Sequence, residues 1–484
     1  MHWRKTDTKV FSFTWTREAV IPAMLAKSDT LQQHKSLTKQ MLLFALPIMA
    51  MNILQLLFNA ADMIVVGRFA GSNALAAVGA TGSLINLLVN LFMGLSVGTT
   101  VVVANEYGAR NYADVRKTVH TSMGVSIISG IIVMIIGLIF CTPLLEWMGT
   151  PADIIDWSSL YLKIYFLGLP ASMVYNFGAA ILRAVGDSRS PMYFLTIAGV
   201  VNVILNVFFV IALNMHVDGV AWATVISQYL SMVLIVISLS KTHGPIQLFP
   251  RQIRIEKSKL AAIVRIGLPA GLQSLLFSIS NVLIQSAVNS FGSVVVAANA
   301  AGGNVEGFIG TTMNAYYNAA ITYTGQKMGA KDYDGIDMVA RVSTVFVFAT
   351  WIILGGFTML FGPYLLGFYT TDPQVIEVGM LRLNIMMAVY FTCAIMNVFP
   401  GLTRAMGYSI LPMLSTLFGA CIMRIVWLMT VFKWYPTVTM LFMVYPVTWT
   451  IAGAGQVAIY FYARRQIRKK AADEQPSTSH TAAV

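Results

Sequence analysis

Residues 118–142, TVHTSMGVSIISGIIVMIIGLIFCT, contain no Asp, Glu, Lys or Arg. A helix that crosses a bilayer needs about 20 consecutive, mostly apolar residues, and this stretch is long enough to do so. Similar stretches recur along the whole 484-residue chain, in which 57% of the residues are hydrophobic and only 11% are charged. Because a soluble domain carries roughly a quarter charged residues, the sequence predicts a membrane protein with many spans.

The apolar stretches number twelve, which predicts an all-α polytopic membrane protein with twelve transmembrane helices. Their ends are expected to shift by a few residues, because sequence patterns locate boundaries less well than elements. The expected limits are 41–66, 74–104, 118–142, 158–181, 191–213 and 219–240 in the first half, and 261–288, 295–325, 340–365, 378–403, 412–433 and 440–462 in the second half.

The two halves of the chain repeat each other at an offset of 221 or 222 residues. Each repeat holds an even number of spans, so both halves insert in the same direction. We therefore expect two six-helix lobes related by a pseudo-two-fold axis along the membrane normal. The matching segments are Ala45-Leu46-Pro47 with Gly267-Leu268-Pro269, Gly108–Tyr112 with Gly329–Tyr333, and Arg183–Gly186 with Arg404–Gly407, each of the last two followed by a proline, Pro191 and Pro412.

Lysine and arginine predict the orientation, because they accumulate on the cytosolic side of a membrane protein. With both termini in the cytosol, all but five of the 32 basic residues fall on that side; the exceptions are Arg68, Lys163, Arg382, Arg424 and Lys433. The net charge of +12 is thereby explained without nucleic acid. The expected organisation is a basic cytosolic tail 1–40, an N-lobe 41–240, a cytosolic linker 241–260, a C-lobe 261–463 and a cytosolic tail 464–484.

The N-terminal tail alternates aromatic and basic residues, with Trp3, Phe11, Phe13 and Trp15 as the aromatic ones. This pattern fits a segment that lies on the membrane surface. It fits a disordered tail equally well. The segment lacks the compact apolar core and small-residue cleavage site of a secretory signal peptide.

One carboxylate, Asp62, lies inside the first predicted span, and ionisable groups within a membrane are expensive and commonly functional. Asn59 lies one turn before it, and Asn202 and Asn206 share a face of the fifth span at a similar depth. An apolar environment favours the neutral form of a carboxylate, so Asp62 is suited to binding a proton. Hard oxygen ligands also suit sodium. The alternative is a structural carboxylate that caps a helix end.

The second half carries a different pair of deep charges, Glu306 in the eighth span and Arg424 in the eleventh. We expect them to face each other, because pairing offsets the cost of burying both. The pair is either a second cation or substrate site, or a static salt bridge between helices. Lys163 and Arg382 lie nearer the outer ends of their spans, where their long side chains are expected to extend to the interface.

Polar and aromatic residues interrupt the eighth span at Asn314, Tyr316, Tyr317 and Asn318. Aromatic rings attract cations, so these residues are candidates for lining a substrate cavity. At helical spacing they are equally compatible with ordinary packing between helices.

Several kinds of site are missing from the sequence. It has no GxxxxGK[ST] loop for ATP, its six histidines form no metal cluster, and Cys141, Cys393 and Cys421 all lie in apolar segments. We therefore expect no enzyme activity, no cofactor and no structural metal, with energy supplied by an ion gradient. The only metal considered is a sodium ion at Asp62.

These motifs resemble the multidrug and toxic compound extrusion (MATE) family. The resemblance covers roughly residues 40–463 and rests on the repeated segments above, on Asp187 after the first Arg-Ala-Val-Gly, and on Asp62-Met-Ile-Val-Val-Gly67. It implies two lobes around a central cleft, export of organic and often aromatic cations against a proton or sodium flow, and a coupling role for Asp62. The family's Asn-x-x-x-Asp pattern is Asn202-Val-Ile-Leu-Asn206 here, so the second carboxylate is missing. Some members have a glutamate in the seventh helix, which is missing at Leu276-Phe277-Ser278.

The sequence therefore predicts a secondary active efflux transporter in the bacterial cytoplasmic membrane, acting as a monomer on small cationic, aromatic substrates. The main alternative is a flippase for a lipid-linked saccharide, which would need a more basic cavity than the single deep Arg424 suggests. A membrane-embedded enzyme should show clustered Asp, His or Cys residues at one membrane face, and the sequence has no such cluster. A channel fits poorly, because two repeated lobes suit alternating access.

Overall fold

The computed structural model describes residues 17–473 and contains helices but no strands in that range. The chain divides into two compact units, Met1–Leu42 and Leu43–Val484, and every feature discussed below lies in the second. The predicted surface segment with Trp3, Phe11, Phe13 and Trp15 lies outside the described residues. A helix already begins at Arg17, well before the predicted start of the first span at residue 41.

The first lobe is built from α1 to α7. Two of its six spans end in a π-helical turn, and the fourth consists of two short helices bent by 47° at Gly168. The bounds are α1 Arg17–Val65 with η1 Val66–Ala70, α2 Ser72–Gly108, α3 Tyr112–Trp147, α4 Ile155–Leu167, α5 Leu169–Ala184, α6 Arg189–Val207 with η2 Phe208–Ala212, and α7 Val217–Lys241.

The second lobe, α8 to α17, follows a linker with one 3-10 turn, η3 Pro250–Gln252. Its fourth span is again bent, by 56°. The bounds are α8 Lys257–Asn289, α9 Ser293–Gly329, α10 Tyr333–Thr350 with η4 Trp351–Gly355 and α11 Gly356–Gly367, α12 Pro373–Ala388, α13 Tyr390–Ala405, α14 Ile410–Thr416 with η5 Leu417–Ile422 and α15 Met423–Met429, α16 Val431–Trp434 and α17 Val438–Asp473.

Nine helices in the described part of the chain are long and apolar enough to cross a bilayer, and the two bent pairs raise this number to eleven. The twelfth is α9, a 37-residue helix that carries Glu306 and several asparagines. The expectation of twelve membrane helices in two six-helix lobes is thus confirmed. The fourth and tenth spans, predicted at 158–181 and 378–403, are each broken in the middle, which the sequence analysis did not predict.

The repeat is visible in the backbone as well as in the sequence. Helices α2 and α9, α3 and α10, α5 and α13, α6 and α14, and α7 and α17 all begin 221 residues apart. Three pairs of positive φ angles share this offset: 93° and 88° at Gly71 and Gly292, 56° at Arg110 and Lys331, and 99° and 90° at Gly186 and Gly407. Because glycine adopts such angles without steric strain, the Arg-Ala-x-Gly segments end a helix in the same way in both lobes.

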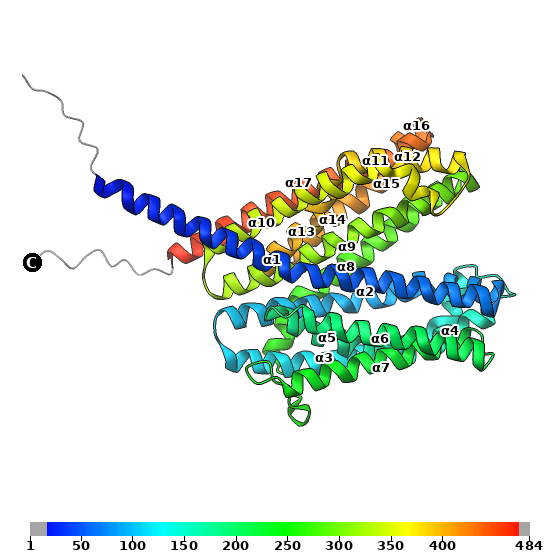
Figure 1. Cartoon of the computed structure of the whole chain (residues 1–484), viewed down its shortest axis with the longest axis horizontal. Helices are drawn as coiled ribbons and strands as arrows, with labels where there is room; N and C mark the ends of the chain where they lie inside the picture. The colour runs from blue at the N-terminus through cyan, green and yellow to red at the C-terminus, as the bar shows by residue number, and fades with distance from the viewer. Residues whose placement is uncertain (1–16, 474–484) are drawn as a thin grey trace, which may run out of the picture. The chain divides into compact units, whose positions relative to one another are not determined.

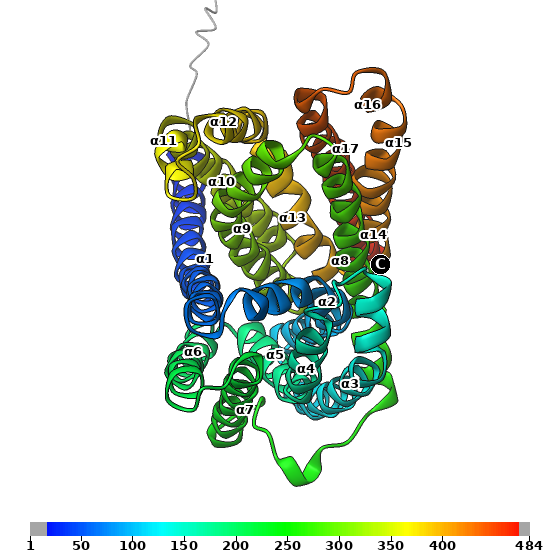
Figure 2. The same cartoon turned by 90° about the vertical axis from the view of Figure 1, so that its right-hand side faces the viewer.

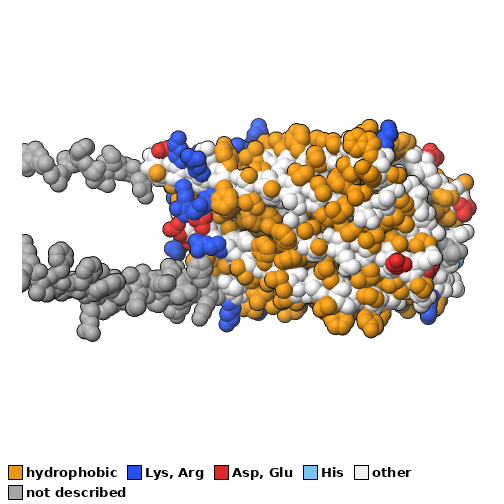
Figure 3. All heavy atoms as spheres, turned by 90° about the horizontal axis from the view of Figure 1, so that it is seen from above, with side chains coloured by type: hydrophobic (Ala, Val, Ile, Leu, Met, Phe, Trp, Pro, Cys, Tyr) orange, Lys and Arg blue, Asp and Glu red, His pale blue; other side chains and the backbone are white. Residues whose placement is uncertain are grey.

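Helix α2 lies between α3–α7 of its own lobe and α9–α17 of the second lobe (Figure 2). One end of the large unit holds the α2–α3, α9–α10 and α13–α14 connections, and α17 also ends there (Figure 1). Lysine and arginine gather at this end, while the flank is mostly hydrophobic (Figure 3). We call it the basic end and the other the opposite end.

The lobes touch in the half of the molecule nearer the basic end. A Cβ at Gly94 of α2 would lie 2.2 Å from the backbone nitrogen of Gly271 in α8, so the two backbones are in direct contact. Asn105 donates to the carbonyl of Ala405 at 3.1 Å. Lys259 forms ion pairs across the lobes, with Glu106 at 2.7 Å and with Asp114 at 3.1 Å. Small residues allow this close approach between apolar helices.

The linker is fixed to the first lobe rather than free. Thr121 of α3 donates to the carbonyl of Arg254 and accepts the N–H of Glu256. His120 accepts the N–H of Phe249 at 3.2 Å through Nε2, and its Nδ1 lies 2.8 Å from the carbonyl of Arg116. The segment between the lobes is therefore held on α3 at the basic end.

Candidate functional site

The structure brings Asp62 together with both asparagines of α6. Asn206 donates through Nδ2 to Oδ1 of Asp62, and also to Oδ1 of Asn202 at 3.2 Å. Asn202 and Asn206 are buried, with 6% and 0% exposure, because α6 turns the face that carries them inward. The carboxylate is thus held by a polar network inside an otherwise apolar lobe.

The network extends to a residue that the sequence analysis missed. Asn202 donates to the hydroxyl of Thr224 on α7 at 3.5 Å. Nothing in the sequence singles out Thr224, because a threonine within a helix is ordinary. Asn59, which was predicted to join this site, does not: its side chain is exposed and has no hydrogen bond to Asp62 or to any other described residue.

One acceptor in this network is unused. Oδ1 of Asn206 is buried and has no hydrogen-bond partner among the described residues. A buried acceptor without a partner loses free energy, and a cation or a proton donor would remove that penalty. The Asp62 carboxylate and the Asn206 amide oxygen are therefore the two groups most suited to receive a positive charge.

Asp62 lies beyond the region where the lobes touch. Asn52 on α1 donates to the carbonyl of Thr311 and to Oδ1 of Asn314 on α9, each at 3.3 Å. No hydrogen bond joins the lobes farther from the basic end than this one, within residues 43–473. Asp62 follows ten residues later on the same helix, which corresponds to about 15 Å along the axis. The site is therefore separated from the basic end by the contact between the lobes.

The predicted pair of Glu306 and Arg424 was wrong, because Glu306 pairs with Arg382 instead. Arg382 donates through Nη2 to Glu306 at 2.8 Å and through Nε to Asn299 at 3.0 Å. The expectation that Arg382 extends to the interface was also wrong, since the residue is only 4% exposed. The bend between α12 and α13 at Val389 lies seven residues after Arg382, and the sequence pattern did not indicate it.

Arg424 is fully buried in a separate environment in the second lobe. It donates to Asn281 at 2.6 Å and to Ser280 at 3.2 Å, both on α8. Its guanidinium carbon lies 4.9 Å from the ring centre of Phe277 and 5.1 Å from that of Tyr445. These rings partly offset the cost of burying the charge. No carboxylate is within salt-bridge distance of Arg424 among the described residues.

The repeat explains where Arg424 sits. The offset between the lobes is 221 at the starts of α6 and α14, and the π-helical turn η5, which precedes Arg424, adds one residue. At an offset of 222, Arg424 corresponds to Asn202, and its partner Asn281 corresponds to Asn59. The second lobe therefore holds a fixed positive charge where the first lobe holds part of the Asp62 network. This correspondence was available in the sequence, but it was not used.

The four candidates for the substrate cavity do not share one face. Asn314 and Asn318 are joined by a hydrogen bond at 2.8 Å, and Asn314 also accepts from Asn52 across the lobes. Tyr317 accepts from the guanidinium of Arg404 at 2.8 Å. Tyr316 points the other way: it is buried, bonds to Thr350 and packs on Phe346. Its predicted place in a cavity with the other three is therefore wrong.

The part of the chain that the structure describes contains no metal-binding cluster and no disulfide bond. No group of three or more His, Cys, Asp or Glu side chains converges on one point there. Cys141, Cys393 and Cys421 are buried and unpaired.

Comparisons with known proteins agree with this architecture. The MatE family model matches the chain twice, at residues 47–208 and 269–430, an offset of 222 residues. A curated relative, the "Probable multidrug resistance protein YoeA" of Bacillus subtilis, is 28% identical over 394 residues, which cover 79% of this chain and 84% of the relative. The "Probable multidrug resistance protein NorM" of Thermotoga maritima is 25% identical over 80% of this chain and 83% of its own length.

Solved structures show the same fold. The MATE transporter VcmN of Vibrio cholerae, in its bent form, superposes with a TM-score of 0.84 at 22% identity, covering 90% of this chain and 99% of that one. A MOP-superfamily transporter of Pyrococcus furiosus gives a TM-score of 0.82 at 22% identity, over 89% of this chain and 96% of its own. Since the family model matches well over half of the sequence in two copies, the chain belongs to the MatE family, the multidrug and toxic compound extrusion transporters.

Proposed function

We propose that this protein is a secondary active transporter that exports small organic cations in exchange for protons or sodium ions. The observation that carries the proposal is the Asp62 carboxylate, which lies inside the first lobe and accepts a hydrogen bond from Asn206, whose own amide oxygen is buried without a partner. Curated relatives named as multidrug resistance or multidrug export proteins support the substrate class.

The distribution of charge supports an orientation with the basic end in the cytosol. Both termini would then be cytosolic, in a bacterial cytoplasmic membrane. In this orientation the lobes are closed on the cytosolic side through α2 and α8, and Asp62 lies outside that contact. The conformation would be the outward-facing one, in which Asp62 exchanges its ligand with the outside.

The proposed cycle depends on a single carboxylate that serves two ligands in turn. In the inward-facing state an organic cation enters between the lobes and is attracted by Asp62. After the lobes rock outward, a proton or sodium ion binds Asp62, with the Asn206 oxygen as a further ligand, and the neutralised site releases the cation. Because Asp62 cannot hold both positive charges at once, exchange is obligatory.

The second lobe is assigned a different role in this proposal. Glu306 is already neutralised by Arg382 at 2.8 Å, and Arg424 is a fixed positive charge. A cation would therefore gain little from binding in the second lobe. We infer that coupling rests on Asp62 alone, which gives one coupling charge in each cycle, and that Glu306, Arg382 and Arg424 hold the second lobe together.

The test is uptake of a fluorescent organic cation into inside-out vesicles, under an imposed proton gradient and then under a sodium gradient. Asp62→Asn should abolish gradient-driven uptake, and the gradient that drives the wild type names the ion. Asp153→Asn, which changes an exposed carboxylate at the opposite end, is the matched control and should transport normally. Full coupled uptake by Asp62→Asn would refute the proposal. Absence of uptake under either gradient in the wild type would favour a lipid-linked saccharide as cargo.

A further inference from the structure

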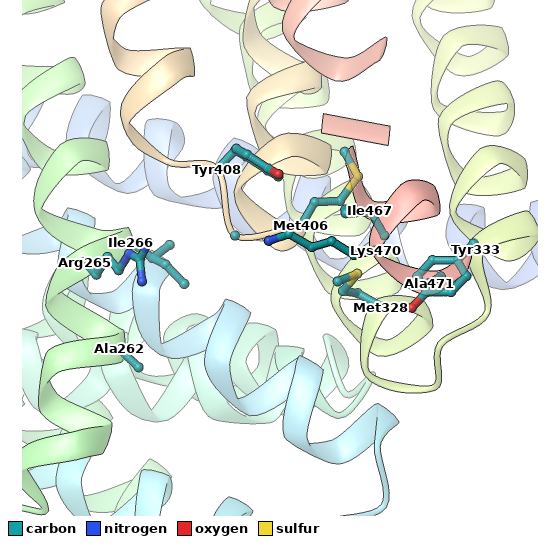
Figure 4. Close-up of a pocket in the computed structure, with 11 residues that line it drawn as sticks. Ala262, Arg265, Ile266, Met328, Tyr333, Met406, Tyr408, Ile467, Lys470 and Ala471 are labelled. Carbon is teal, nitrogen blue, oxygen red and sulfur yellow. The ribbon is translucent and has the colours of Figure 1, made fainter. Parts of the chain in front are cut away.

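The second lobe contains a cavity of about 500 Å³ at the basic end, away from Asp62 and from the deep charges of the lobe (Figure 4). It is formed where α8, the α9–α10 connection, the α13–α14 connection and the end of α17 meet. The residues that line it are Ala262, Arg265, Ile266, Met328, Tyr333, Met406, Gly407, Tyr408, Ile467, Lys470 and Ala471.

The lining of the cavity carries two positive charges and no negative charge to balance them. Arg265 and Lys470 contribute two cations from opposite walls, and Figure 4 shows the Lys470 side chain extending toward the α8 side, where Arg265 lies. None of the described lining residues is acidic. Neither cation has a hydrogen bond or an ion pair with another described residue.

Two other basic residues of α17 are paired with carboxylates of α10. Arg464 bonds to Asp337 at 2.5 Å, and Arg468 pairs with Asp334 at 2.6 Å. Acidic partners are therefore present nearby, but none of them points into the cavity.

The repeat shows that the first lobe is built differently at this place. Tyr408 corresponds to Asp187 at the offset of 221 residues. Asp187 accepts hydrogen bonds from the N–H groups of Arg189 and Ser190. Replacing this carboxylate by a phenol in the second lobe removes the negative charge that would otherwise compete with an anion beside Arg265 and Lys470.

The cavity also borders the surface that faces the membrane. The ring of Tyr408 contacts that of Tyr462, with centroids 6.2 Å apart. Tyr462, the adjacent Phe461 and Ile410 are all more than half exposed, as expected for side chains next to lipid. A molecule in the cavity can therefore have an anionic group between the cations and apolar chains along α17.

We propose that this cavity binds the phosphate headgroup of an anionic phospholipid from the leaflet at the basic end. Arg265 and Lys470 neutralise the phosphate, the hydroxyls of Tyr333 and Tyr408 donate hydrogen bonds to its oxygens, and the acyl chains lie against Phe461 and Tyr462. Basic pockets between membrane helices on the cytosolic side are suited to such headgroups. The proposed lipid site does not depend on the ion or the cargo that binds at Asp62. It can therefore be tested separately from the proposed transport function.

The experiment is native mass spectrometry of the purified full-length protein with phosphatidylglycerol, and with phosphatidylcholine of the same chains. The wild type should retain one phosphatidylglycerol in preference to phosphatidylcholine. The double variant Arg265→Gln, Lys470→Gln should bind it about thirtyfold more weakly, since each surface cation near an anionic lipid contributes roughly a factor of five. The control double variant Arg465→Gln, Lys469→Gln removes two cations of α17 that do not line the cavity, and should keep the preference.

Three outcomes would overturn the assignment. One is equal retention of phosphatidylglycerol by the wild type and the cavity variant, and another is an equal loss in both double variants. The third is displacement of the lipid by millimolar inorganic phosphate, which would identify a free-anion site. Thermal unfolding of both variants shows whether either loss reflects misfolding, and Asp62-dependent uptake in phosphatidylcholine vesicles should be the same in all three proteins.

Discussion

At the scale of single residues, the first lobe concentrates its chemistry on one charge. Asp62 has no second carboxylate beside it, because position 206 is an asparagine that donates to it. The amide orients the carboxylate and offers its own oxygen, but it cannot accept a proton. In the proposed transport cycle, ion binding is therefore expected to depend on the Asn206 amide for affinity and on Asp62 for charge.

Replacing Asn206 by Leu should separate these two contributions. We expect the sodium concentration for half-maximal uptake to rise about tenfold or more, because the Asn206 oxygen is lost as a ligand. If protons drive the uptake, the proton concentration for half-maximal uptake should fall, because the hydrogen bond that Asn206 donates favours the ionised carboxylate. Maximal uptake should persist, since the carboxylate remains. Asn176→Leu is the control, because Asn176 bonds only to Ser172 of its own helix. An unchanged ion dependence in Asn206→Leu would remove Asn206 from the site.

The Glu306–Arg382 pair makes a second residue-scale prediction. Arg382→Gln should destabilise the protein by about 1–3 kcal/mol, because it leaves the partly buried carboxylate of Glu306 without its partner. The double variant Glu306→Gln, Arg382→Gln should recover most of this loss, since neither charge is then left unpaired. Thermal unfolding in detergent measures both effects. If the double variant were as unstable as the single one, the pair would not act as a unit.

At the scale of elements, α3 and α10 each begin with a side chain that caps the helix, but the capping residue is an asparagine in the first lobe and an aspartate in the second. Asn111 caps α3 by accepting the N–H of Asp114, and Asp332 caps α10 by accepting the N–H of Gly335. Lys327 also bonds to Asp332 at 2.7 Å. Partial burial acts to raise the pKa of Asp332, but the bonds from Lys327 and Gly335 outweigh it and hold the pKa below its ordinary value of 3.8.

This difference predicts a dependence on pH for one cap only. Because the pKa of Asp332 is lowered in the folded state, its contribution to stability is present above pH 3.8 and is lost as the pH falls through the folded-state value. Asp332→Asn should keep the cap and lose that acid dependence, while Asp332→Ala should cost about 1 kcal/mol at neutral pH. Unfolding midpoints at pH 7 and pH 3 measure this, and Asp332→Asn is the control because it keeps the cap without the charge. Equal pH dependence in the wild type and in Asp332→Asn would contradict the assignment.

Irregularities within the helices account for the features that the predicted spans did not include. The bends at Gly168 and Val389 and the π-helical turns are local changes of helix geometry, and an average of hydrophobicity over about twenty residues cannot detect them. They nevertheless decide which side chains face inward. The turn η5 adds the residue that places Arg424 in the position of Asn202, and Arg382 is buried beside the break between α12 and α13.

At the scale of the whole molecule, the contact between lobes is the element that transport must open. Gly94 is one of several close points, where a Cβ would lie 2.2 Å from the backbone of α8. Gly94→Leu should therefore disfavour the closed basic end and shift the population toward the open one. Gly82→Leu is the matched control on the same helix, since a Cβ there meets nothing within 4 Å.

Spin labels report this shift directly. With the three native cysteines replaced, labels at Arg189→Cys and Arg465→Cys mark the two lobes at the basic end. The distance between them should lengthen or broaden in Gly94→Leu and stay as in the wild type in Gly82→Leu. An unchanged distance in Gly94→Leu would show that the glycine contact does not hold the basic end closed.

The sequence by itself determined the membrane class, the twelve helices, the repeat and the resemblance to the family, because each depends on composition and on residues close together in the chain. It also indicated Asp62, Asn202 and Asn206, since a polar group in an apolar span is conspicuous. Only the tertiary structure decided the partners. Glu306 meets Arg382 and not Arg424, Tyr316 turns away from its neighbours, and Thr224 completes the network. The physical reason is that pairing depends on how the helices rotate and bend. One extra residue at a break rotates the rest of the helix about its axis, and this changes which side chains meet.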